Sequence, residues 1–117
     1  MSRMLREMLN AADARSGSSW QPAVDVYQSG NAWLIKADLA GVDPDNIAIR
    51  LAGRRVTISG ARVDGPCETD QRCYLMEISY NRFERSIELP CAVDGARVTT
   101  DYRNGLLLIH LSLESAV

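Results

Sequence analysis

The chain has 117 residues, of which 46% are hydrophobic and 24% are charged, and its formal net charge is −2. This length and composition are typical of one globular domain that can bury a real hydrophobic core. No stretch concentrates Lys or Arg, and no apolar run approaches the roughly 20 residues of a membrane span. We therefore expect neither a nucleic-acid nor a membrane partner.

The N-terminal residues contain no continuous apolar segment of the kind found in secretory signals, so we expect a cytoplasmic protein. Cys67, Cys73 and Cys91 are irregularly spaced, with no Cys-x-x-Cys pair and no neighbouring His. This spacing predicts neither a zinc site nor a redox motif. We expect free thiols in a reducing compartment and no cofactor or metal.

Residues 1–19 are predicted to form a separate arm with a short amphipathic helix. Its apolar stripe recurs at helical spacing and consists of Met4, Leu5, Met8 and Leu9. A helix of about three turns is marginal alone in water, so the arm needs a surface to bind. Packing on its own domain and docking on another subunit or an unfolded client both remain open.

From Trp20 onward, apolar and polar residues alternate in short runs separated by turn residues, a pattern typical of β-strands. We predict about eight strands, and with no helix between them this order indicates an antiparallel β-sandwich. The predicted strands cover residues 24–27, 33–39, 47–51, 56–60, 74–80, 83–89, 98–102 and 107–113.

The last two strands are predicted to form a hairpin around Asn104-Gly105, because both central positions of a type I′ turn need positive φ. The strand after this turn is apolar on both faces, with Leu106 and Leu108 opposite Leu107 and Ile109. This pattern predicts that both faces of the strand are covered.

Residues 61–73 form a polar connection that is long for a hairpin, and long loops are often functional. Beyond it, Arg85 falls on the apolar face of the 83–89 strand. A buried charge needs a partner, and Glu77, across the turn or on a second subunit, is the candidate.

Nothing in the sequence indicates catalysis. His110 is the only histidine and lies within an apolar strand, and the Gly-x-Ser-x-Gly motif is absent. The sequence also has no phosphate-binding loop, so it offers no support for an ATP-driven cycle. We predict that the protein is not an enzyme.

Several motifs, taken in order, resemble the α-crystallin domain of small heat-shock proteins of the bacterial and plant type. The first half carries Pro22-Ala-Val-Asp-Val-Tyr, Ala37-Asp-Leu-Ala-Gly-Val and Val56-Thr-Ile-Ser-Gly-Ala-Arg. Glu77-Ile-Ser-Tyr-Asn-Arg-Phe-Glu-Arg with Leu89-Pro90, and Tyr102-Arg-Asn-Gly-Leu-Leu-Leu-Ile-His-Leu, resemble the middle and closing signatures. The resemblance covers residues 20–113.

The resemblance implies an immunoglobulin-like sandwich that forms a homodimer by strand exchange. The loop of one subunit would pair with the first strand of its partner, which removes an exposed strand edge. Glu77 and Arg85 would support this contact. The expected dimer interface comprises Val24, Val26, Tyr27, Cys73, Tyr74, Glu77 and Arg85.

The chain departs from the family pattern at three internal positions and at its end. Ala40, Asn81 and Thr100 replace the usual Pro, Gly and Ala, and Asn81 is expected to keep the left-handed turn. Residues 114–117 form a short stub in place of an extension with an Ile-x-Ile/Val motif. Leu111-Ser-Leu113 has the spacing of that motif but is predicted to be the end of the last strand, which makes assembly beyond a dimer an open question.

The resemblance further implies an ATP-independent holdase that binds partly unfolded proteins and suppresses their aggregation. We expect clients or partner segments in a groove lined by Ile47, Ile49, Leu51, Val98 and Thr100, and at the arm. The alternative is a non-catalytic interaction module of the same fold, similar to CS-domain co-chaperones, which would act as a monomer.

Overall fold

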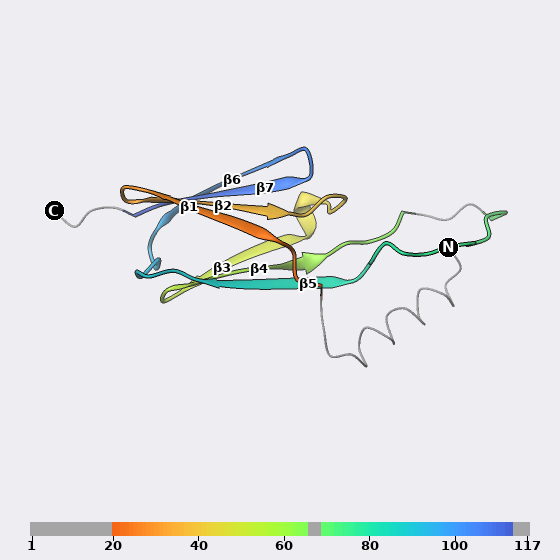
Figure 1. The fold of residues 1–117 in the computed structure, drawn as a ribbon, viewed down its shortest axis with the longest axis horizontal. Helices are drawn as coiled ribbons and strands as arrows, with labels where there is room; N and C mark the ends of the chain where they lie inside the picture. Colours follow the sequence, from red (N-terminus) through yellow and green to blue (C-terminus); the bar gives the residue numbers. More distant parts are fainter. Residues whose placement is uncertain (1–19, 66–68, 114–117) are drawn as a thin grey trace.

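Seven antiparallel strands form two sheets in a computed structural model that describes residues 20–65 and 69–113 (Figure 1). The first sheet has the order β1-β2-β7-β6 and the second has the order β3-β4-β5. The strands are β1 Val24–Ser29, β2 Ala32–Asp38, β3 Ile47–Ala52, β4 Arg55–Ala61, β5 Arg82–Glu88, β6 Arg97–Arg103 and β7 Leu106–Ser112. The predicted all-β sandwich is confirmed, and residues 1–19, for which a helical arm was predicted, lie outside the described residues.

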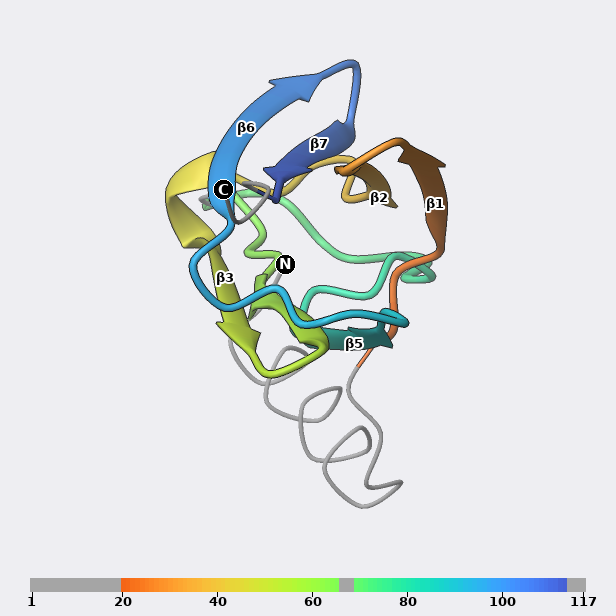
Figure 2. The ribbon, with the colours of Figure 1, turned by 90° about the vertical axis from the view of Figure 1, so that its left-hand side faces the viewer.

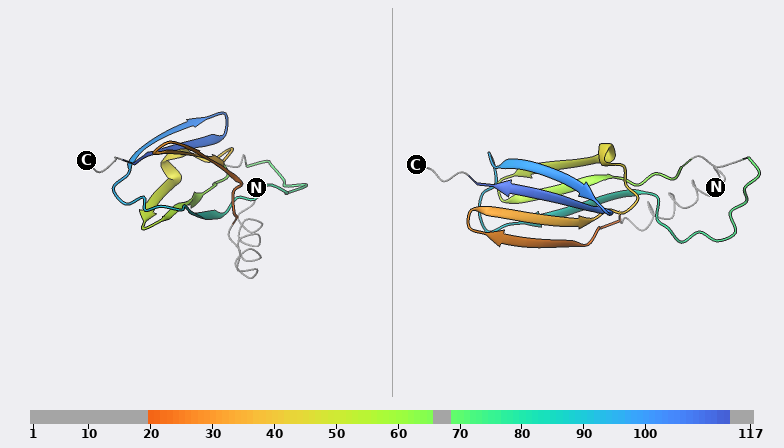
Figure 3. Two further views of the ribbon diagram at one scale, coloured as in Figure 1. Left: turned by 60° about the vertical axis from the view of Figure 1, so that its left-hand side comes forward. Right: turned by 90° about the horizontal axis from the view of Figure 1, so that it is seen from above.

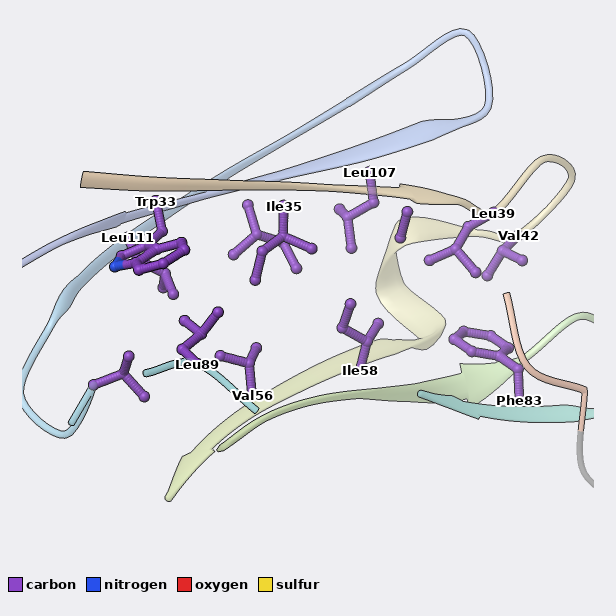
Figure 4. Close-up of a cluster of buried hydrophobic side chains, with 13 residues drawn as sticks. Trp33, Ile35, Leu39, Val42, Val56, Ile58, Phe83, Leu89, Leu107 and Leu111 are labelled. Carbon is purple, nitrogen blue, oxygen red and sulfur yellow. The ribbon is translucent and has the colours of Figure 1, made fainter. Parts of the chain in front are cut away.

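The core lies between the two sheets and is built from the inward-facing residue of every second position (Figure 4). On β2, Trp33, Ile35 and Ala37 are buried, as the alternation predicts. The four-stranded sheet also contributes Leu107, Ile109 and Leu111, and the three-stranded sheet contributes Val56, Ile58 and Phe83. Leu39, Val42, Leu89 and Val93 close the core from the connecting loops.

The β6–β7 hairpin turns at Asn104-Gly105, where both residues have positive φ, of 52° and 80°. These angles fit the type I′ turn that the residue types predict. The register pairs Tyr102 with Leu107 and Thr100 with Ile109. Leu111 and Ser112 end β7, as predicted, and Leu113 directly follows the strand.

The expectation that both faces of β7 are covered is wrong for the part of the chain that the structure describes. On its outer face Leu106 is 39% exposed and His110 is exposed, while Leu108 is half-buried. Shielding on this face comes from cross-strand neighbours instead, since Leu34 pairs with His110 and Lys36 pairs with Leu108. Lateral contacts of this kind stabilise a sheet without a third layer.

The predicted strand at 74–80 does not form within one chain. Between β4 and β5, the described residues 62–65 and 69–81 contain no strand, although Tyr74, Met76, Ile78 and Tyr80 alternate. A strand needs the hydrogen bonds of a neighbour, and this segment projects past the end of the sandwich, away from the strand edges of its own chain (Figure 3). Asn81 also departs from expectation, since it does not adopt positive φ.

Candidate functional site: two open strand edges and a projecting segment

The two sheets differ in width, and this leaves inward-facing residues exposed at both sides of the sandwich. In the end-on view, β6 and β3 lie along one side, and β1 and β5 lie along the other (Figure 2). The four-stranded sheet extends beyond the three-stranded sheet. Inner-face residues of its edge strands therefore lack a complete covering layer.

On the β6 side, Val98 and Thr100 pair with the fully buried Leu111 and Ile109, so they point toward the interior. Even so, Val98 is 38% exposed and Thr100 is also exposed. Across from them Ile47, Ile49 and Leu51 of β3 are only partly buried against the core. The five residues predicted for the client groove therefore lie on two neighbouring edges that are open to solvent.

The end of this open side is fixed by a hydrogen bond. The Tyr102 hydroxyl on β6 donates to the Leu39 carbonyl oxygen at 2.7 Å. Tyr102 thereby anchors the end of β6 to the chain that follows β2. The apolar residues nearer the start of β6 remain accessible.

On the opposite side, β1 forms the other edge of the four-stranded sheet and pairs only with β2. Val24 and Val26 face the interior, since they pair with the buried Ala37 and Ile35, but Val26 is 37% exposed. Tyr27 points to the outer face and is exposed, with the Lys36 ammonium 5.1 Å from its ring centroid. An edge strand with free backbone groups is a ready template for another strand.

Arg85 lies on the β1 side of the sandwich. Its Nη1 donates to the Pro22 carbonyl oxygen just before β1, at a long 3.4 Å. Among the residues that the structure describes, no ion pair joins Arg85 to Glu77, so the expectation of a partner across the turn is wrong for a single chain. The alternative of Glu77 from a second subunit stays a prediction.

The segment between β4 and β5 projects past the end of the sandwich (Figure 3). It carries exposed apolar side chains: Tyr74 is 101% exposed and Leu75 is 73% exposed, and Ile78 is also exposed. Cys73 beside them is a half-buried free thiol. Apolar side chains this exposed are unusual unless another molecule covers them.

The expected dimer residues are thus divided between two places. Val24, Val26, Tyr27 and Arg85 lie along the β1 side, whereas Cys73, Tyr74 and Glu77 lie on the projecting segment. The structure does not bring these two groups together within one chain. Their separation is what exchange between two chains requires.

The predicted client contacts of the arm, Met4, Leu5, Met8 and Leu9, lie outside the described residues, as does Cys67. In the described ranges, no three His, Cys, Asp or Glu side chains are grouped to hold a metal ion. No helix in these ranges is long and apolar enough to cross a membrane.

Sequence reasoning missed a hollow of about 300 Å³ on the outer face of the four-stranded sheet, next to the β1–β2 turn. Tyr27, Leu34, His110 and Thr99 form one cross-strand row of its lining. The sequence did contain a sign of this hollow, because β7 has apolar residues on both faces. In a sandwich of two sheets only one face of a strand meets the core, so the other apolar face must be open.

Known proteins resemble this chain in sequence and in fold. The model of the Hsp20/alpha crystallin family matches residues 25–117. The chain belongs to this family. The resemblance inferred from the motifs is therefore confirmed.

Individual members of the family show how far the similarity extends. The chain is 38% identical over 100 residues to Spore protein SP21 of Stigmatella aurantiaca, which covers 86% of this chain and 59% of that protein. A small heat-shock protein from Xylella fastidiosa is 27% identical, with a TM-score of 0.66 and coverage of 86% and 92%. Heat shock protein 16.0 from Schizosaccharomyces pombe shares the fold, with a TM-score of 0.72, 22% identity and coverage of 85% and 97%.

Proposed function

We propose that this chain is an ATP-independent holdase that binds partly unfolded proteins and suppresses their aggregation. The observation that carries the proposal is the set of inward-facing residues that are exposed on the β6 edge and only partly buried on the β3 edge. Such edges take an extended apolar segment by strand addition, in which backbone hydrogen bonds give affinity. Membership of a family that includes proteins named heat shock proteins supports a chaperone role.

The proposed working unit is a homodimer. In each chain the projecting segment would pair with β1 of the partner, where its alternation at 74–80 would form the strand that is missing in the single chain. Glu77 on the projecting segment of one chain would then approach the partner's Arg85, which lies on the β1 side of the sandwich. The Xylella relative is described as having a distinct high order structure, which is consistent with self-association of the fold.

Holdase binding needs no chemical step. A holdase lowers the concentration of free, aggregation-prone chains by binding them, and this shifts the equilibrium without nucleotide. Catalysis has no part in the proposal. Cys73 and Cys91 are free thiols, which is consistent with action in the reducing cytoplasm.

Light scattering of a heat-labile client tests the proposal, with and without this protein at equal subunit ratio and without ATP. We expect the protein to suppress scattering. Two variants with matched exposure locate the surface: Val98→Asp on the inner face of β6 and Leu106→Asp on the outer face of β7. We expect Val98→Asp to reduce protection, because a charge opposes apolar docking, and Leu106→Asp to retain it.

A version without residues 1–15 separates the arm from the sandwich as client surfaces. We expect a folded dimer with reduced protection, and full protection would place the client site on the sandwich alone. A folded wild-type protein that stays monomeric and leaves scattering unchanged would contradict the holdase proposal. It would favour an interaction module similar to CS-domain co-chaperones.

A further inference from the structure

Arg62, the first residue after β4, contacts three separate parts of the chain where the projecting segment begins. Its Nε donates to the Ser79 carbonyl oxygen at 2.8 Å, and its Nη1 donates to the Ala40 carbonyl oxygen at 3.1 Å. Its backbone N–H donates to the Asn81 carbonyl oxygen at 3.0 Å. One residue thus joins the outgoing and returning ends of the segment and ties both to the loop after β2.

The guanidinium of Arg62 also stacks on Trp20, with its central carbon 4.1 Å from the ring centroid. Trp20 is itself fixed against β5. Its N–H donates to the Arg82 carbonyl oxygen, its carbonyl oxygen accepts from the Glu84 N–H, and its ring meets Phe83 edge-on at 5.4 Å. A planar guanidinium can use its fork of donors and its face at once, which an ammonium group cannot.

We infer that Arg62 and Trp20 form a latch that sets the direction of the projecting segment before a second chain binds. This inference rests on the proposed dimer. Beyond the latched residues 62, 79 and 81, the side chains of Tyr74 and Leu75 make few contacts with their own chain and are highly exposed. The latch therefore orders the base of the segment and leaves its apolar part available to a second copy of this chain.

The latch acts through the population of the binding-competent conformation. If only a fraction of free chains holds the segment in the required direction, the apparent dissociation constant rises by the inverse of that fraction. Losing the latch then slows association, whereas the contacts between the two chains, and hence the dissociation rate, stay the same. Arg62 is in this sense a positioning residue for dimer formation.

The test compares Arg62→Lys with Arg50→Lys, a matched change at an exposed arginine on β3. Sedimentation gives the dimer dissociation constant, and mixing of differently labelled dimers gives the dissociation rate. We expect Arg62→Lys to raise the dissociation constant about tenfold with an unchanged dissociation rate, and Arg50→Lys to change neither. Trp20→Leu, which removes the stacked ring but keeps the three carbonyl contacts, should shift the constant in the same direction by less.

An unchanged dissociation constant in Arg62→Lys would overturn the latch. A dissociation rate that rises in proportion to the constant would also overturn it, because Arg62 would then act in the bound interface. If Arg62→Lys fails to fold, Trp20→Leu carries the same test with the same readouts. A wild-type protein that is monomeric at all concentrations would refute the proposed dimer itself, which separates that failure from failure of the latch.

Discussion

The sandwich and the projecting segment use the same sequence pattern with opposite results. On β2 the alternation of Trp33, Ile35 and Ala37 becomes a strand, because β1 and β7 lie on either side to accept its hydrogen bonds. At 74–80 the same alternation leaves Tyr74 and Ile78 exposed and forms no strand. Alternation therefore indicates which residues can form a strand, and an open strand edge within reach of those residues decides whether they do.

The comparison extends to the edges of the sheets. β7 is central in its sheet and buries Leu107, Ile109 and Leu111, whereas β1 and β6 at the margins leave Val26 and Val98 partly exposed. The central strands have a hydrogen-bonded neighbour on each side and need no other chain to complete their pairing. The margins and the projecting segment are the parts that another chain can complete.

The largest expected effect lies in the core. Ile109→Ala removes a fully buried side chain from β7, and we expect it to lower the free energy of unfolding by about 2–5 kcal/mol. Leu106→Ala, on the outer face of the same strand, is the control and should cost less than about 1 kcal/mol. Urea denaturation followed by circular dichroism measures both, and equal losses would contradict the assignment of inner and outer faces.

A second change tests how closely the end of β4 packs against Asn46 and Phe83. Gly60, near the end of β4, has no room for a side chain, because an added Cβ would meet the Asn46 carbonyl oxygen and lie 2.7 Å from the Phe83 ring. We expect Gly60→Ala to destabilise the fold by about 1–3 kcal/mol.

Gly65 provides the matched control for this change, since an added Cβ there meets nothing within 4 Å. Thermal unfolding of both variants at one protein concentration makes the comparison. A Gly60→Ala variant as stable as Gly65→Ala would show that β4 lies farther from Asn46, the last residue of the short 3-10 helix Pro44–Asn46, than the structure places it.

A third, smaller effect concerns the proposed contact between subunits. Arg85→Glu places like charges together if Glu77 of the partner subunit approaches this position, and we expect the dimer dissociation constant to rise about tenfold, or about 1.4 kcal/mol. Arg50→Glu, at an exposed position of β3, is the control. Sedimentation at several concentrations measures both, and an unchanged constant for Arg85→Glu would remove this pair from the interface.

Local patterns predicted most of the fold. Alternation located seven strands, and Asn104-Gly105 located the last turn. Both were predictable because the two-residue period of a strand and the residue preferences of a turn depend only on neighbours in the sequence. The error at 74–80 has a different origin, since strand formation there depends on a partner edge. The expectation for β7 failed because apolar residues on both faces do not specify a third layer.

The candidate site was predictable as a set of residues but not as an arrangement. Ile49 and Val98 were assigned to one groove from the resemblance, whereas the exposure of Val98 follows from the greater width of the four-stranded sheet. The latch was not predictable, because Arg62 reaches Trp20 and Ala40 across long stretches of sequence. Its acceptors are backbone carbonyl oxygens, which every residue has, so no sequence pattern marks them.

The most direct test of the account replaces residues 63–80 with a short Gly-Ser linker and compares its mass in solution with that of wild type by sedimentation equilibrium. We expect wild type to be a dimer or a multiple of dimers and the variant to be a monomer with the same β-sheet circular dichroism. A variant that remains dimeric, or a wild type that sediments at the 12.9 kDa of one chain, would contradict exchange of the projecting segment between subunits.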